Sequence, residues 1–120
     1  MNQARATSFS TLKDLRAYIK CLIDGGSPRH CLNVGDNGEG AWGDNMAQLT
    51  VPYVALPPSV GVHNKHLRVV LKGMGHEKPF ECICGDKGPD GVIDLNPAAL
   101  IAAGLPSDTE LDCPAEWEWV

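Results

Sequence analysis

The second half of the chain alternates short apolar runs with turn residues such as glycine and proline. These runs are rich in β-branched, leucine and aromatic residues, which favour β-strands. The last run places glutamates on one face and Trp117 and Trp119 on the other, so we expect both tryptophans to pack in or at the end of the core. Short strands at this spacing indicate a barrel or a sandwich rather than a βαβ sheet. The expected strands are residues 51–56, 67–72, 79–84, 91–95 and 116–120.

Residues 11–24 have a helical period instead. Thr11 and Asp14 form a capping-box pattern, and Gly25 follows the last periodic residue. We expect an amphipathic helix whose apolar stripe packs on the rest of the domain; the alternative is a helix that binds a partner. The stripe consists of Leu12, Leu15, Ile19, Leu22 and Ile23.

A second, shorter helix is predicted at residues 97–103. Asn96 is a favourable N-cap, Pro97 takes the first helical position, and Gly104 follows the last turn. Its composition is mostly apolar, so we expect it to cover one flank of the sheet.

The segment between the first helix and the first expected strand is rich in glycine, asparagine and aspartate, which favour tight turns. Within it, Trp42 stands two residues before Asp44. An aromatic face beside a carboxylate suits a sugar-binding cleft, because the ring stacks on the sugar and the carboxylate accepts its hydroxyls. The alternative is that Trp42 fills the end of the barrel.

Length and charge narrow the functional classes. The chain has 120 residues, the size of one domain, and a formal net charge of −5. This charge argues against a general nucleic-acid binder and against docking on anionic lipid. The sequence has no apolar run long enough for a membrane span, and its first residues lack the apolar core of a secretory signal. We therefore expect synthesis in the cytoplasm without a signal peptide.

Cysteines and histidines give little support for a metal site. The odd count of 5 cysteines fits either a reduced compartment, or one or two disulfides with at least one free thiol. Cys82 and Cys84 are too close for a zinc knuckle and are typical of buried neighbours on a strand. His63, His66 and His76 fall in expected turns without a convincing third ligand. We predict no metal and no cofactor.

Residues 85–100, GDKGPDGVIDLNPAAL, resemble the Asp-Arg-Gly-Pro … Ile-Asp-Leu-Ser-x-Ala-Ala stretch of the rare lipoprotein A family. The upstream Ala-Leu-Pro-Pro at residues 55–58 and the valine-rich strand after it follow the same order. More loosely, the chain is similar to the barrels of expansins and family 45 endoglucanases. The likeness covers about residues 40–120 and leaves 1–39 as an N-terminal helix and loop. It implies a mainly β fold, a six-stranded double-psi β-barrel with a shallow groove, within a single domain of residues 1–120.

The resemblance also implies site residues. Asp86 matches the catalytic aspartate of the Asp-Arg-Gly-Pro motif, and Asp94 matches the general acid of expansins and endoglucanases. Tyr53 stands where rare lipoprotein A proteins have a histidine, and a tyrosine with a pKa of about 10 is a poor base at neutral pH. Asp86 then needs another partner, for which Asp44 and His66 are candidates. The expected substrate-binding residues are Trp42, Tyr53, Lys87 and His66.

Both aspartates also have a structural interpretation. Asp86 could simply cap the turn formed by residues 87–89, and Asp94 could hold backbone amides at the start of the second helix. The sequence alone leaves both interpretations open.

Two functions remain. The first is an enzyme that cleaves a cell-wall glycan such as peptidoglycan, as a lytic transglycosylase or a glycoside hydrolase, with Asp86, Asp94 and Asp44 as catalytic residues. Such a protein would act at the wall or in the periplasm after release by lysis or by a secretion system, and an immunity or other protein would be a further partner class. The alternative is a non-catalytic barrel that binds wall carbohydrate or serves as a structural interaction module.

Overall fold

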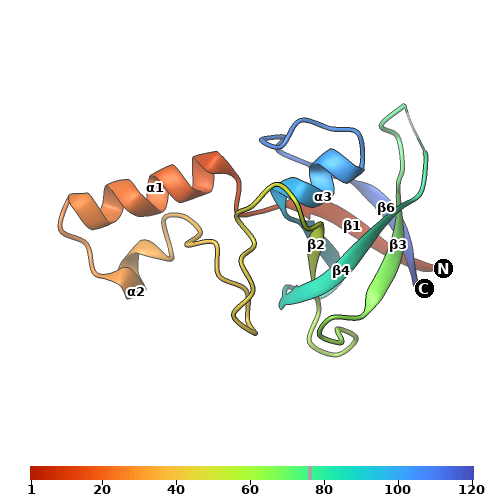
Figure 1. The fold of residues 1–120 in the computed structure, drawn as a ribbon, viewed down its shortest axis with the longest axis horizontal. Coiled ribbons are helices and arrows are strands. Elements are labelled where there is room, and N and C mark those ends of the chain that lie inside the picture. Colours follow the sequence, from red (N-terminus) through yellow and green to blue (C-terminus); the bar gives the residue numbers. More distant parts are fainter. Residues whose placement is uncertain (76) are drawn as a thin grey trace.

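Six β-strands close into a barrel in the computed structural model of the chain, which describes residues 1–75 and 77–120 (Figure 1). The strand order around the barrel is β1-β5-β2-β4-β3-β6, and most neighbours pair antiparallel, whereas β1 with β5 and β2 with β4 are parallel. The prediction of a mainly β fold with a closed barrel is confirmed. His76, expected in a turn, lies outside the described residues. The strands are β1 Asn2–Ser8, β2 Tyr53–Leu56, β3 His66–Leu71, β4 Phe80–Lys87, β5 Val92–Leu95 and β6 Asp112–Trp119.

The barrel does not begin at residue 40, as the sequence suggested, because β1 is one of its strands. β1 lies between β5 and β6 and pairs with both. Its side chains are polar or small, and only Ala6 is fully buried. A strand that contributes so little apolar surface gives no alternating signal, which is why residues 1–39 were assigned wholly to a helix and loop.

Inside the barrel, every second side chain of each strand meets in one core. Val54 and Leu56 of β2 and Ile93 and Leu95 of β5 are fully buried there. Trp117 is 5 % exposed and meets Trp119 edge to face, with ring centroids 5.0 Å apart. The expectation that these tryptophans pack in the core is confirmed.

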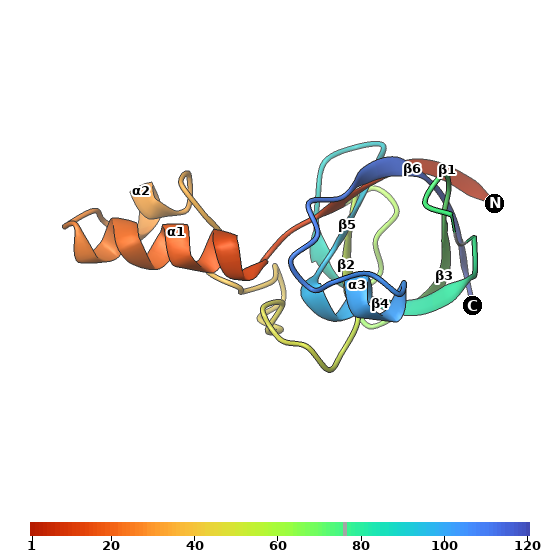
Figure 2. The ribbon, with the colours of Figure 1, turned by 90° about the horizontal axis from the view of Figure 1, so that it is seen from above.

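The short helix α3, Pro97–Ala102, covers one flank of the barrel (Figure 2). Asn96 caps it by accepting a hydrogen bond from the backbone N–H of Ala99, and Pro97 takes the first turn. The residues from Pro97 to Leu100 are buried, so this helix packs as predicted.

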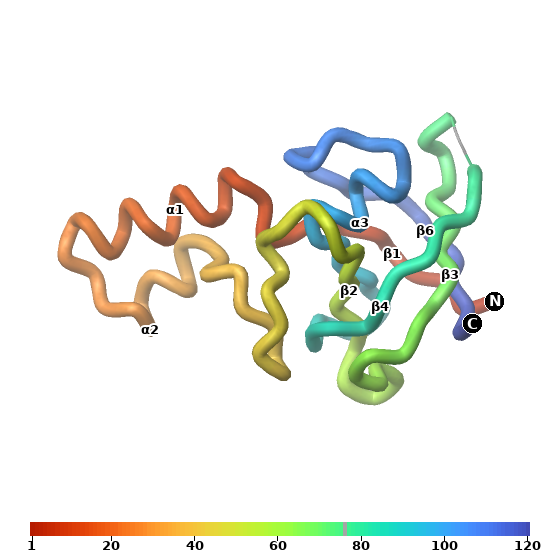
Figure 3. Tube along the Cα trace, viewed as in Figure 1, coloured from red at the N-terminus to blue at the C-terminus, as the bar shows by residue number. Residues whose placement is uncertain are grey.

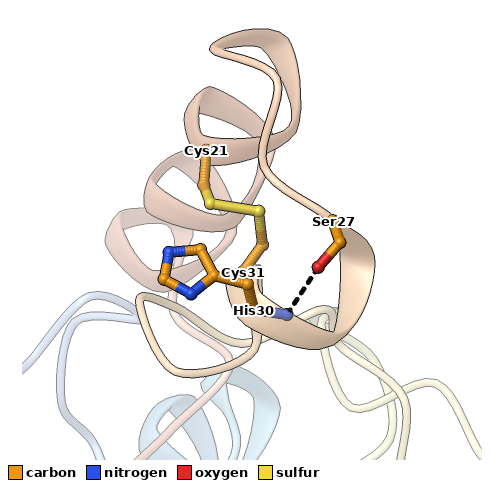
Figure 4. Close-up of a disulfide and its surroundings, with 4 residues drawn as sticks. All are labelled: Cys21, Ser27, His30 and Cys31. Carbon is orange, nitrogen blue, oxygen red and sulfur yellow. Dashed lines mark hydrogen bonds between the residues drawn. A yellow bond between two sulfur atoms is a disulfide. The ribbon is translucent and has the colours of Figure 1, made fainter.

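The remaining helices form an arm that extends away from the barrel (Figures 1 and 2). We call residues 12–35 the arm; it contains α1, Leu12–Ile23, and α2, Pro28–Cys31. The two are joined by a disulfide between Cys21 and Cys31 (Figure 4). Ser10, with a φ of 54°, turns the chain from β1 into α1. Among the described residues, no helix has the length and hydropathy needed to cross a membrane.

The expected packing of the α1 stripe on the barrel is wrong. Leu12, Ile19 and Ile23 are 54 %, 51 % and 78 % exposed, and α1 contains no buried residue. The opposite face of α1 does the packing instead, because the returning chain at Gly35 lies against the backbone of Asp14 and Tyr18. A side chain at residue 35 would collide with that backbone. The helix therefore packs against its own arm and leaves its most apolar face outward.

The disulfide is expected to stabilise the arm and not the barrel. Replacing Cys21 and Cys31 by serine removes a crosslink between two positions ten residues apart. The lost chain-entropy effect should lower the stability by about 2–3 kcal/mol. The loss falls on the arm, because α1 buries nothing against the core. Hydrogen exchange should therefore quicken at the amides of α1 and stay unchanged in β3. Faster exchange in both elements would show that the arm and barrel unfold together.

Candidate carboxylate site

Asp86 and Asp94 lie on either side of Ala55, on the outer surface of the barrel. In the sheet register, Ala55 of β2 pairs with Asp86 of β4 and with Asp94 of β5. Ala55 points outward, since it packs with Phe9 and Met46 in a cluster separate from the barrel core. Two strand spacings separate the Cα atoms of the aspartates by roughly 10 Å. The sheet thus brings the two predicted carboxylates to one face.

Asp94 is the more strongly perturbed of the two. Burial raises its pKa to about 6, and the nearby charges of Asp36, Asp14 and Asp86 act in the same direction. The hydroxyl of Thr7 donates a hydrogen bond of 2.8 Å to Asp94 Oδ1, which opposes the rise. Asp94 accepts from this hydroxyl, and the amide at the start of α3 is held by Asn96 instead. Asp94 is therefore placed to carry a proton in mildly acidic solution.

Asp86 holds a loop in place. Its Oδ1 accepts hydrogen bonds from the backbone N–H groups of Ala41, at 2.7 Å, and Lys87, at 2.8 Å. Burial raises the pKa of Asp86, whereas these two amides lower it. The bond from Lys87 is the turn-capping contact of the structural interpretation. The bond from Ala41 joins two residues that are 45 positions apart in the sequence, and it holds the loop around Trp42 at the end of β4.

A second group of side chains surrounds Trp42. His63 Nε2 and Asp44 Oδ2 are 2.6 Å apart, and the ring of His63 stacks on that of Trp42 with centroids 4.6 Å apart. Lys87 Nζ lies 5.4 Å from the centroid of Trp42. Trp42 is 36 % exposed and lies outside the barrel core, so it does not fill the barrel end. His63 lies in a turn, as expected, and its ring is partly buried.

Tyr53 lies beside Gly85 and near Asp44. Its ring lies against Gly85, where a Cβ atom would come within 2.5 Å of the Tyr53 ring. Burial and the nearby charge of Asp44 raise the pKa of Tyr53, so its hydroxyl stays protonated. Tyr53 can donate a hydrogen bond but cannot serve as a base at neutral pH.

His66, the other candidate partner of Asp86, turns to a different neighbour. Its Nδ1 lies 3.2 Å from Glu81 Oε2, and both side chains are exposed. The structure therefore places His63, and not His66, beside Asp44 and Trp42. Nothing in the sequence distinguished the two histidines, because both flank the same turn.

Two further residues of the site were missed by sequence reasoning. Thr7 comes from the unrecognised strand β1, and Asp36 comes from the loop after the arm. Asp36 also lines an open polar hollow of about 330 Å³, together with Asp14, Asn37 and Glu39. Apart from Asp14, its lining comes from residues between 32 and 39. There the chain leaves the end of the arm and leads toward the barrel (Figure 3).

The described residues contain no group of three or more His, Cys, Asp or Glu side chains arranged to hold a metal ion. The thiols of Cys82, Cys84 and Cys113 are free and buried. Burial raises the pKa of each of them, so they remain protonated and unreactive. The chemistry of the site rests on carboxylates, one histidine and aromatic rings.

Comparison with known proteins gives a fold and no family. No protein-family model matches the chain, and no curated protein matches it. Among solved structures, the chain is similar to "Streptomyces papain inhibitor (SPI)", with 16 % sequence identity and a TM-score of 0.51. The match covers 97 % of this chain and 94 % of that one. At this identity, the likeness shows a shared fold alone.

Proposed function

We propose that the chain cleaves a glycosidic bond in a cell-wall glycan, with peptidoglycan as the substrate and Asp94 as the proton donor. The observation that carries this proposal is the raised pKa of Asp94, about 6, in a side chain that shares one barrel face with Asp86. A glycosidase needs a carboxylic acid that keeps its proton until the leaving oxygen takes it. The proposal includes a barrel of the double-psi type, which the motif at residues 85–100 supports.

The other residues take roles that follow from their positions. Asp86, with two amides on Oδ1, is placed to act as the charged partner that activates water or steadies the positive sugar ring. In the lytic route, a hydroxyl of the sugar attacks in place of water as the glycosidic bond breaks. Asp94 then gives its proton to the leaving oxygen and takes up the proton of the attacking hydroxyl. Trp42, Tyr53 and Lys87 would contact the glycan, and Asp44 would orient His63 beside them.

Digestion of purified sacculi tests the proposal. The wild-type chain should release muropeptides, and Asp94→Asn should reduce the release about a hundredfold, since the proton donor is lost while the shape is kept. Asp86→Asn should reduce it as well. Asp108→Asn is the matched control, because Asp108 is exposed and outside the site. Release that is equal in Asp94→Asn and wild type would refute the proposed chemistry.

The disulfide supports a place of action outside a reducing compartment. A bond such as Cys21–Cys31 persists in oxidising surroundings and is rare in the cytosol. This agrees with work at the wall or in the periplasm after release from the cell.

A second candidate function is binding of a protein, as in an inhibitor. Asp86 fixes the loop around Trp42 through a backbone hydrogen bond, and a preorganised loop is what a rigid inhibitor presents. The solved structure with the same fold is called a papain inhibitor. Sacculi that stay intact, together with inhibition of papain that Trp42→Ala weakens, would favour this candidate over the enzyme.

A further inference from the structure

The α1 stripe, which consists of Leu12, Leu15, Ile19, Leu22 and Ile23, is an apolar surface that the described chain covers only in part. Three of its members are at least half exposed, and the other two are partly buried. The arm that carries it is held in shape by the Cys21–Cys31 disulfide and by close packing on the opposite face of α1. An apolar patch on a rigid element marks a contact site, because exposing it to water is unfavourable.

The spacing within the stripe indicates the shape of the partner. Residues 12, 15, 19 and 22 are separated by three, four and three positions, which is the a/d spacing of a coiled-coil seam. A seam of this kind receives the side chains of a second helix lying alongside it. α1 spans 12 residues, slightly fewer than two heptads, and these four positions are its a/d contacts.

A hollow at the base of the arm extends this seam onto the barrel. Its volume is about 250 Å³, and its lining is mostly apolar, including Leu12 and Leu15 of α1 and Leu49, which is 61 % exposed. Ala47 and Pro97 complete the apolar wall. A helix lying on the stripe would reach this hollow at one end and could place a large apolar side chain there.

The charges beside the stripe indicate the sign of the partner's charge. Lys13, Arg16 and Lys20 follow one another at helical spacing along one flank of α1. The described residues provide Lys13 with an exposed partner, Glu110, and form no salt bridge to Arg16 or Lys20. The arm has four basic and two acidic residues, although the whole chain has a net charge of −5. The arm is therefore the basic end of an acidic molecule, and it attracts an acidic partner that the barrel repels.

A second copy of the chain fits this surface poorly. In an antiparallel pair, a two-fold axis places the same flank of each helix side by side, so that Lys13, Arg16 and Lys20 of both copies would meet. In a parallel pair, the two acidic barrels would lie next to each other. Both arrangements bring like charges together, which disfavours self-association.

We propose that the arm is a docking site for an acidic amphipathic helix of another protein, which packs along the α1 stripe and pairs its carboxylates with Arg16 and Lys20. This site is independent of the carboxylate site and of glycan cleavage. It faces outward on the arm, whereas the aspartates lie on the barrel. Docking and catalysis can therefore be lost separately.

Two synthetic peptides test the proposal with the intact, oxidised chain. Both carry leucines at i, i+3, i+7 and i+10; one has glutamate at its exposed positions and the other has lysine. Fluorescence anisotropy should show saturable binding of the glutamate peptide and much weaker binding of the lysine peptide. The double variant Ile19→Ser and Ile23→Ser should weaken binding of the glutamate peptide about tenfold or more. Both positions are exposed, so the fold should survive, and circular dichroism checks that it does.

Val62→Ser is the matched control, because Val62 is 50 % exposed and lies on the barrel side of the molecule. It should leave peptide binding unchanged while Ile19→Ser with Ile23→Ser lowers it. Equal binding of both peptides, or no binding of the glutamate peptide, would overturn the proposal. Sedimentation showing a dimer that Ile19→Ser and Ile23→Ser abolish would assign the stripe to a second copy. Binding to vesicles of phosphatidylcholine and phosphatidylserine, lost in the same variant, would assign it to a membrane.

Discussion

Replacing Asn96 by alanine is expected to lower the free energy of unfolding by about 4 kcal/mol. The side chain is fully buried and makes four hydrogen bonds. Its Oδ1 accepts from the backbone N–H groups of Tyr53 and Ala99, both at 2.9 Å. Its Nδ2 donates to the carbonyls of Met46, at 2.9 Å, and Val51, at 3.1 Å. Alanine would leave the N–H groups of Tyr53 and Ala99 and the carbonyl of Met46 without this partner, at about 1–3 kcal/mol for each group that stays buried and unpaired. The carbonyl of Val51 keeps a second hydrogen bond, which Gln48 Nε2 donates at 2.7 Å.

This one side chain connects three parts of the fold: the start of α3, the first residue of β2 and the loop that covers the outside of β2. Urea denaturation, followed by the fluorescence of the buried Trp117, measures the loss. Asn37→Ala is the control, because Asn37 is exposed and makes a single capping bond to the N–H of Glu39. Its cost should stay below about 1 kcal/mol. A similar loss in the two variants would mean that the buried network contributes little.

Replacing Asp94 by asparagine is expected to stabilise the chain at neutral pH while it removes the proposed activity. Folding raises the pKa of Asp94 from 3.8 to about 6, mainly by burial. Above that pH, the folded chain must hold a half-buried charge, at a cost on the order of 3 kcal/mol. Asparagine keeps the acceptor for Thr7 and carries no charge. The proposed proton donor is thus a source of instability, as expected if this carboxyl group is functional.

The raised pKa of Asp94 determines how the stability of the wild type changes with pH. Between pH 4 and 6 the folded state binds the proton of Asp94 and the unfolded state has lost it, so the contribution of Asp94 to stability falls as the pH rises through this window. The stability difference between Asp94→Asn and wild type should be near zero at pH 4 and reach its full size above pH 6. Asp108→Asn, an exposed position outside the site, serves as the control for the exchange of a carboxyl group for an amide. A difference that is constant from pH 4 to 7 would contradict the raised pKa.

Much of the fold could be predicted from the sequence because the strands after residue 50 bury alternate side chains. The capping residues of α3 gave its position within one residue. β1 was not predicted because its residues are small and polar and show no alternating hydrophobic pattern. Its neighbours supply its hydrogen bonds and most of the core. The stripe of α1 was recognised, but its direction was not. Periodicity shows that a helix has an apolar face and says nothing about which face the rest of the chain reaches first.

The site was predictable in part for a related reason. Asp86 and Asp94 follow one motif, but their position across Ala55 depends on the parallel pairing of β2 with β4, which no local pattern encodes. His63 meets Asp44 of a loop that Asp86 anchors at Ala41. Such contacts join turns that are far apart in the sequence, and turns carry no hydrophobic period. Asp36 remained hidden for the same reason, since its effect on Asp94 acts through space.

The pairing of β1 with β6 has a consequence for how the barrel forms. Asn2 lies opposite Trp117, so β1, which is synthesised well before β6, has one edge unpaired until β6 is made. Barrel closure is then a late event with a large loop-closure entropy, and we expect slow folding with an exposed edge in the nascent chain. The arm, whose contacts are local, has no such delay. We therefore expect the arm to fold, with the apolar stripe of α1 exposed, before the barrel closes.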